Sequence, residues 1–427
     1  MSTQIAHPAD AIAGRRSLRT ERLLVPAGSI TTAGNAFQIT AAAILVFRAG
    51  QTTLSVGWLF IAVSIPQVLF AFLFGRLADK VDRRLLSVTA DLISAVTALA
   101  LPVWLWLHGP TTLGSYLANF LLATTAALFM PASNALIRER IQDQRLGKFN
   151  SHYEMATNVG MLMASSSAGF LVVVFGPTPL FVFNSGTFIA SAILTWLIGR
   201  KPLTVAPAGT GTEAAETEAA KTDDVRPAAR PAAQPIKRLA LLFTAGNANL
   251  MVSNVILTTL ILQYFRQSPW MIGVVDALAG FGFIVGAACY GRISTRIKGL
   301  NLAVLGSLGC MTMVIFEPLG PYVLMSVIPF AAFFFANGRI AARTLLMRAS
   351  PVDKVGRIFG GAQAFGLALG IAATVGLSVL ADATRIPYAF WGLVILVDAI
   401  VVGTYISLVR PLSALGKQPE ILEATAA

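Results

Sequence analysis

Long uncharged, apolar runs alternate along this chain with short stretches in which basic residues cluster. A helix needs about 20 mostly apolar residues to cross the ~30 Å hydrocarbon core of a bilayer, and each run is long enough to cross once or twice. The ~10-residue segments of alternating polarity that are typical of transmembrane β-barrels do not occur in the sequence. The pattern therefore predicts an all-α polytopic membrane protein.

Twelve membrane-spanning helices are expected from the lengths of these runs. The uncharged run 155–199 is divided by Gly176-Pro177-Thr178-Pro179, because clustered glycine and proline break helices. The expected spans are 24–47, 54–78, 85–107, 113–136, 153–175, 180–198, 239–263, 269–292, 301–316, 320–341, 358–380 and 387–409. An even number of spans places both chain termini on the same side of the membrane.

Composition and charge agree with this class. Hydrophobic residues make up 56% and charged residues 12% of the chain, whereas soluble domains hold about 25% charged residues. The net charge of +12 comes from basic clusters between the apolar runs, which is an orientation signal rather than a nucleic-acid-binding face. Apart from Arg48, Arg266 and Arg385, all of the 32 Lys and Arg residues lie in segments on one side. We expect a bacterial inner (plasma) membrane protein with both termini cytoplasmic.

One long polar segment divides the spans into two sets of six. Residues 201–237 are rich in Ala, Thr, Pro and Glu. They hold too little apolar surface to offset the conformational entropy lost on folding, so we expect a flexible cytoplasmic linker. Gly75-Arg76-Leu77 has a counterpart 216 residues later in Gly291-Arg292-Ile293, which is typical of transporters built from repeats. The expected domains are a cytoplasmic tail (1–23), a six-helix bundle (24–200), the linker (201–237), a second six-helix bundle (238–410) and a cytoplasmic tail (411–427).

The most specific motif is Gly75-Arg76-Leu77-Ala78-Asp79-Lys80-Val81-Asp82-Arg83-Arg84. It resembles the loop signature that the major facilitator superfamily carries between its second and third helices, with Asp82 where the superfamily usually has glycine. That variant is similar to the branch that contains macrolide efflux proteins and the enterobactin exporter. The resemblance implies two pseudo-symmetric six-helix bundles that transport a small molecule, with no catalysis and no cofactor or metal.

The resemblance also implies a conformational latch at this loop. Asp79 would hold the first bundle to the eleventh helix in the outward-facing state, with Arg138 as a plausible partner. The expected latch residues are Gly75, Asp79, Arg83, Arg84, Asp91 and Arg138. The alternative is that the loop only fixes orientation, which accounts for its Lys and Arg residues better than for Gly75 and Asp79.

Three acidic residues, Asp91, Asp276 and Asp398, fall within the expected spans, where charge is costly and marks candidate functional sites. Asp276 lies ~12 Å into its span at 1.5 Å per residue, and the resemblance puts that helix at the central cavity, so it is the first candidate for proton coupling. Asp398, near mid-membrane, and Glu154, at the inner mouth of its span, are further candidates. The alternative for each is structural pairing with a neighbouring residue. The basic residues expected to pair with Glu154 are Arg138, Arg140 or Lys148.

Polar residues form matching faces on the expected spans 1 and 7. Thr31, Asn35 and Gln38 share one helix face, and the 216-residue offset carries Thr31 onto Asn247 and Gln38 onto Asn254. The resemblance implies that these helices line the central pathway, while the alternative is interhelical hydrogen bonding. The expected substrate-cavity residues are Thr31, Asn35, Gln38, Asn247, Asn254, Thr258 and Gln363.

These features favour a monomeric secondary transporter that exports a small, largely apolar organic compound, such as a drug, an antibiotic or a siderophore-like molecule. Transport would occur by alternating access of the two bundles and would be driven by proton antiport. Residues 113–136 hold no Arg and residues 164–169 hold no Gly-Pro pair, unlike many drug–proton antiporters of the family, so uptake or facilitated diffusion of a small metabolite stays open. A membrane enzyme or sensor would need clustered titratable residues or a soluble module, and the sequence shows neither.

Overall fold

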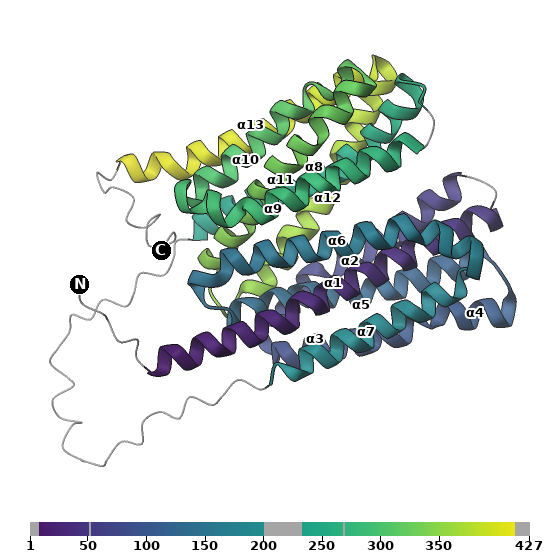
Figure 1. Ribbon diagram of the computed structural model, residues 1–427, viewed down its shortest axis with the longest axis horizontal. Coiled ribbons are helices and arrows are strands. Elements are labelled where there is room, and N and C mark those ends of the chain that lie inside the picture. Colours follow the sequence, from purple (N-terminus) through teal and green to yellow (C-terminus); the bar gives the residue numbers. More distant parts are fainter. Residues whose placement is uncertain (1–7, 51–52, 200–232, 268–269, 415–427) are drawn as a thin grey trace, which may run out of the picture.

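The computed structural model describes residues 8–50, 53–199, 233–267 and 270–414, and its regular elements are helices. Figure 1 shows two helical bundles, one from the first half of the chain in purple to teal and one from the second half in green to yellow. The all-α, two-bundle fold that the sequence predicts is confirmed. Most of the expected linker 201–237 and of the tail 411–427 lies outside the described residues.

The first bundle follows the expected order of spans. Its helices are α1 (Pro8–Gly50), α2 (Thr53–Lys80), α3 (Arg83–Ala98), α4 (Ala100–His108), α5 (Thr112–Arg140), α6 (Asp143–Phe175) and α7 (Thr178–Leu197). The helices α3 and α4 adjoin at Leu99 and together form one span, Arg83–His108. Because α1 begins at Pro8, part of the expected tail 1–23 is helical.

The second bundle repeats this order. Its elements are α8 (Ala233–Thr259), the π-helical turn η1 (Leu260–Tyr264), α9 (Trp270–Arg296), α10 (Gly299–Val314), the 3₁₀ turn η2 (Glu317–Leu319), α11 (Pro321–Ala349), α12 (Val355–Ala383) and α13 (Ile386–Ala414). The helix α11 ends eight residues beyond the expected boundary at 341, which places two more arginines, Arg343 and Arg348, on a helix.

The expected count of spans holds for the described residues. Eleven continuous helical stretches have the length and hydropathy to cross a membrane, and α6 makes a twelfth when its two bent parts are taken together. Large apolar side chains on the outer surface, such as Val96 at 71% and Trp106 at 83% exposure, suit contact with hydrocarbon rather than water.

The helix α6 bends by 41° between Ser165 and Ser167. The Ser165 hydroxyl donates to the carbonyl oxygen of Leu162 at 3.2 Å, and the Ser167 hydroxyl donates to that of Met163 at 2.7 Å. Serine hydroxyls that bond to the preceding turn commonly bend helices. The bend therefore occurs within the stretch 164–169, where the sequence lacks a Gly-Pro pair.

Close packing joins the two bundles at one end of the molecule. We call the end where α1 begins and α13 finishes the terminal end, on the left of Figure 1, and the opposite end the distal end. A Cβ atom on Gly75 of α2 would lie 2.8 Å from the Cα atom of Arg357 of α12, and one on Gly356 would lie 2.8 Å from the carbonyl oxygen of Gly75. Only glycine permits this approach of the two backbones.

A second contact between the bundles joins α6 to α9. The Ser151 hydroxyl donates to the carbonyl oxygen of Ala287, and a Cβ on Gly147 would lie 3.3 Å from the ring of Tyr290. Farther toward the distal end, the Leu162 side chain fills the space beside Gly280. These pairs show that α6 and α9 run antiparallel and pack along their terminal halves.

Candidate functional site

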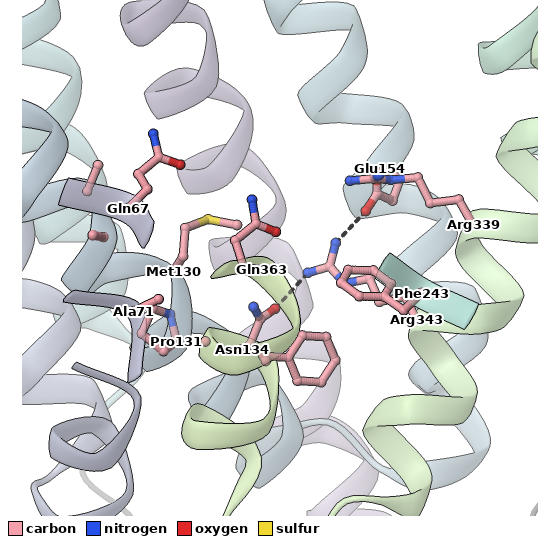
Figure 2. Close-up of a pocket in the computed structure, with 14 residues that line it drawn as sticks. Gln67, Ala71, Met130, Pro131, Asn134, Glu154, Phe243, Arg339, Arg343 and Gln363 are labelled. Carbon is pink, nitrogen blue, oxygen red and sulfur yellow. Dashed lines mark hydrogen bonds and ion pairs between the residues drawn. The ribbon is translucent and has the colours of Figure 1, made fainter. Parts of the chain in front are cut away.

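A cavity of about 150 Å³ lies between the two bundles, and both contribute to its wall. Figure 2 shows its polar side chains converging from helices of both halves of the chain. The lining residues are Gln67, Ala71, Ala126, Ala127, Met130, Pro131, Asn134, Glu154, Phe243, Arg339, Arg343, Phe359, Gly360 and Gln363. The wall therefore combines alanine, methionine and aromatic surface with three fixed charges.

The three charges form one ion-pair cluster across the bundle interface. The Glu154 carboxylate of α6 accepts from Arg343 Nη1 at 2.6 Å and from Arg339 Nε at 3.2 Å, both on α11. The side chains of Glu154 and Arg343 are only 6% and 8% exposed. The two arginines are four residues apart, so they lie on one face of α11 and both reach the same carboxylate.

Neutral polar groups extend this cluster on both sides. Arg343 Nη2 donates to Asn134 Oδ1 of α5 at 2.9 Å, and the guanidinium stacks 4.9 Å from the ring centre of Tyr153. Arg339 Nη1 donates to Asn247 Oδ1 of α8 at 2.7 Å. Asn247 Nδ2 in turn donates to Gln363 Oε1 of α12 at 3.2 Å. The network thus ties α5 and α6 to α8, α11 and α12.

The sequence interpretation of Glu154 was wrong about its partners. We expected Arg138, Arg140 or Lys148 from the same bundle, whereas the carboxylate pairs with two arginines of the opposite bundle. Arg138 pairs with Asp143 instead, so it is not the partner of Asp79 either. Arg138 and Arg140 lie in the last turn of α5, where they pair with Asp143 and Glu139 of their own bundle.

Asp79 lies in the last turn of α2 and contacts the start of α12. Its Oδ1 accepts from the backbone N–H of Gly356 at 2.8 Å, and its Oδ2 accepts from that of Arg357 at 3.2 Å. The Arg357 Nε lies 3.7 Å from the same carboxylate. A carboxylate at the N-terminus of a helix satisfies free N–H groups and interacts favourably with the helix dipole. Asp79 therefore caps a helix of the opposite bundle.

Of the other expected latch residues, Arg83 contacts both bundles, whereas Arg84 and Asp91 lie within the first. Arg83 joins Glu139 of α5 at 3.0 Å and also donates to the carbonyl oxygen of Val352, between α11 and α12. Arg84 stays within the first bundle, where it donates to the carbonyl oxygen of Trp196 and stacks on its ring. Asp91 is completely buried within α3 and forms no ion pair among the residues that the structure describes.

The other proton-coupling candidates lie apart from the cavity. Asp276 is exposed on α9, one turn from Gly280, and within the described ranges no basic side chain comes within ion-pair distance of it. Asp398 of α13 is partly buried, and its Oδ1 has no hydrogen-bond partner in the described part of the chain.

The expected substrate-cavity residues are only partly brought together. Gln363 lines the cavity and Asn247 supports it through hydrogen bonds to Gln363 and Arg339. Gln38 is buried against α7, where its Oε1 accepts from Asn184 at 3.4 Å. Thr31 and Asn35 are not among the lining residues, and the side chains of Asn254 and Thr258 lie outside the described residues.

Sequence reasoning missed the two arginines that dominate the site. The sequence pattern assigns both Arg339 and Arg343 to the basic residues that set orientation, since they lie at or beyond the expected end of the tenth span at 341. One signal could have corrected this: after Arg343 the sequence continues with Leu345, Leu346 and Met347, all buried. Apolar residues at these positions, with arginines four apart, are typical of a helix that continues inside the protein.

Comparisons with known proteins agree with this architecture. The chain is 25% identical over 387 residues to the multidrug efflux pump Tap of Mycolicibacterium fortuitum, covering 87% of this chain and 91% of that protein. It is 23% identical over 388 residues to the uncharacterised MFS-type transporter YfiS of Bacillus subtilis (strain 168), covering 86% and 88%. The fold is similar to a bacterial homologue of the iron transporter ferroportin in an outward-facing state, with a TM-score of 0.72 at 16% identity over 90% of this chain and 99% of that one.

A family model also matches most of the chain. The sequence model of the Major Facilitator Superfamily matches residues 24–374, which include the loop at Asp79, the cavity and most of both bundles. This chain therefore belongs to the Major Facilitator Superfamily and is a multi-pass membrane transporter, not an enzyme.

Proposed function

We propose that the protein exports a small organic compound with a large apolar part out of the cytoplasm, by alternating access of its two bundles. The observation that carries this proposal is the cavity between the bundles, which combines apolar surface with a few polar groups as small-molecule sites usually do. The similarity to the multidrug efflux pump Tap supports export rather than uptake.

The terminal end is proposed to face the cytoplasm. The basic residues Arg76, Arg83 and Arg140, among many others, lie at helix ends on this side, and loops rich in Lys and Arg stay cytoplasmic. With that orientation, the contacts of α2 with α12 and of α6 with α9 close the cytoplasmic side. This arrangement corresponds to an outward-facing state of the transport cycle.

Asp276 is the proposed proton carrier. Glu154 is a weaker candidate, because two guanidinium groups hold its carboxylate and protonation would leave both without a partner. Asp276 has no such partner among the described residues, and it lies one turn from Gly280, where Leu162 of α6 packs against α9. Protonation of its carboxylate would therefore be coupled to closure of the distal halves.

Export and coupling can be tested in cells that express the protein. We expect cells preloaded with neutral, anionic or cationic dyes (Nile red, anilinonaphthalene sulfonate, ethidium) to lose at least one dye faster than control cells, and faster still when the medium is more acidic than the cytoplasm. Asp276→Asn should remove this acceleration and lower the driven rate at least about fivefold, the lower range of coupling energies between sites. Accumulation instead of depletion would select the uptake alternative, and unchanged acid-driven efflux in Asp276→Asn would refute the assignment.

The cap on α12 gives a second test. Asp79→Asn should keep one acceptor but lose the charge, weakening the contact by about 1 kcal/mol, a typical value for a cap and its helix-dipole interaction. This shifts the balance between the two states about fivefold against closure of the terminal end. We expect transport to fall while insertion and expression stay unchanged.

Asp82→Asn is the matched control for this variant. Asp82 lies three residues away and caps α3 of its own bundle, accepting from the N–H groups of Arg84 and Leu85 at 2.9 and 3.0 Å. The same chemical change there should leave transport nearly intact. Equal losses in the two variants would mean that Asp79 acts only on local stability.

A further inference from the structure

The walls of the cavity carry one more positive than negative charge. Their ionisable residues are Glu154, Arg339 and Arg343, and arginine stays protonated in proteins. One carboxylate serves two guanidinium groups, so one positive charge has no carboxylate of its own in the cavity wall. Excess charge in a partly buried site is unfavourable unless a counter-charge can enter.

The excess charge is concentrated on Arg339. Arg343 is 8% exposed and uses its two terminal nitrogens on Glu154 and Asn134. Arg339 is more open, at 20% exposure, and bonds through Nε and Nη1 only. Its Nη2 has no hydrogen-bond partner among the residues that the structure describes. In Figure 2 the Arg339 side chain extends from α11 toward the part of the cavity that Gln363, Met130 and Gln67 line.

Arg339 also fixes the direction of the neighbouring hydrogen bonds. A guanidinium can only donate, so Asn247 must present its oxygen to Arg339. The Asn247 NH₂ group then faces Gln363 and donates to its oxygen. The Gln363 NH₂ group is left for the cavity, without a partner in the described part of the chain. The cavity thus offers two groups of free donors, Arg339 Nη2 and Gln363 Nε2.

The surroundings of these donors are apolar. The rings of Phe243 and Phe335 each have their centre 6.0 Å from the Arg339 guanidinium carbon. Phe359, Met130 and two alanines of α5 add further apolar surface to the wall of this cavity. An inorganic anion would gain nothing from this surface, whereas the apolar body of an organic anion would bury part of its own surface against it.

From these observations we infer that the transported compound is an organic anion, whose carboxylate or similar head group binds Arg339 Nη2 and Gln363 Nε2 while its apolar body lies against Phe243 and Phe359. This inference rests on the proposed function and specifies its substrate class. It also narrows the sequence-based expectation of a largely apolar compound to one that carries a negative charge. The anion neutralises the charge that Glu154 leaves uncompensated.

The test measures binding to the purified full-length protein and does not require transport. Isothermal titration with three matched probes, 1-naphthoate, 1-naphthamide and 1-naphthylmethylammonium, compares an anion, a neutral amide and a cation on one ring system. We expect 1-naphthoate to bind at least about tenfold more tightly than the amide, since hydrogen bonds to charged groups are the stronger kind. Chloride should compete weakly, because it lacks the apolar body.

Two variants at Arg339 and one elsewhere complete the test. Arg339→Gln should lower the affinity for 1-naphthoate at least about tenfold and that for 1-naphthamide less than about twofold. Arg339→Lys, which keeps the charge, should keep the preference for the anion. Arg292→Gln removes an exposed arginine of α9 outside the cavity and should change neither affinity. Thermal unfolding of each variant shows whether it is folded.

The inference fails if the wild-type protein binds the three probes equally, binds no 1-naphthoate, or keeps its anion preference in a folded Arg339→Gln variant. It also fails if chloride displaces 1-naphthoate at comparable concentrations, which would indicate a site for simple anions. Anion preference without export from cells would contradict the proposed function and leave the binding site in place. Export of dyes without anion preference in binding would support the proposed function and contradict the anion site.

Discussion

Glu154→Gln is expected to be the most damaging single substitution in this protein. The carboxylate is buried and compensates two arginines of the opposite bundle, and removing one partner from a buried ion pair typically costs about 3–5 kcal/mol. Glutamine has nearly the same shape, so the loss comes from the charge rather than from packing. We expect a clear drop in the thermal unfolding temperature of the purified protein and loss of most transport.

A second substitution separates this mechanism from general damage. Arg343→Gln in the Glu154→Gln background removes one of the two uncompensated charges, so the double variant should be more stable than Glu154→Gln alone. Contacting charges show such coupling in double-mutant cycles, whereas independent sites add. Asp353→Asn, an exposed acidic residue between α11 and α12, is the matched control and should unfold like the wild type. If the loss of stability in the double variant equals the sum of the losses in the two single variants, the ion-pair account is contradicted.

The fold could be predicted from the sequence because a membrane imposes simple length and polarity rules. Each apolar run had to span the bilayer, and the helix breakers Gly176 and Pro177 fixed the division of the longest run. Helix ends are predicted less accurately, because α6 begins at Asp143 and α11 ends at Ala349, both outside the expected apolar spans. The charged residues in these extensions interrupt the hydrophobic pattern, so the pattern does not mark where the helix ends.

The site could be predicted only in part. Gln363 and Asn247 followed from polar positions on helices that the resemblance places at the centre. The partners of Glu154 did not, because a contact between residues 154 and 343 depends on how two bundles dock. The positive-inside rule also counts every arginine alike, so it cannot separate Arg343, which is buried in an ion pair, from Arg292, which is exposed.

Alternating access requires the distal halves of α6 and α9 to come into contact when the distal end closes. The helices α6 and α9 run antiparallel, so seven residues beyond the contact of Leu162 with Gly280 along each helix Gly169 comes opposite Gly273. A Cβ on either glycine would have no heavy atom within 4 Å of it in the present state. Two small residues facing each other permit close helix contact. We expect Gly169 and Gly273 to meet when the distal end closes.

The same register places Asp276 opposite the bend of α6 at residues 165–166. Closure would therefore remove this carboxylate from water, which is favourable only when it is protonated. The bend and the carboxylate thus belong to one proposed movement, in which proton binding at Asp276 and closure of the distal end support each other.

Disulfide cross-linking tests this movement directly. In a background with Cys289→Ala and Cys310→Ala, which removes both native cysteines, the pair Gly169→Cys with Gly273→Cys should form a disulfide, because closure brings the two Cα atoms within the roughly 7 Å that such a bond allows. The pair Ser151→Cys with Ala287→Cys, where the side chain of one residue contacts the backbone of the other in the present structure, should form a disulfide in the present state, with the terminal end closed. Each single-cysteine variant is the control for its pair.

Transport measured before and after oxidation of the distal pair is the most direct test of the account. We predict that the disulfide between positions 169 and 273 stops transport completely, that reduction restores it, and that the single-cysteine variants are unaffected by either treatment. Full transport by the cross-linked protein, or no disulfide between these positions under any turnover condition, would contradict alternating access through the distal halves of α6 and α9.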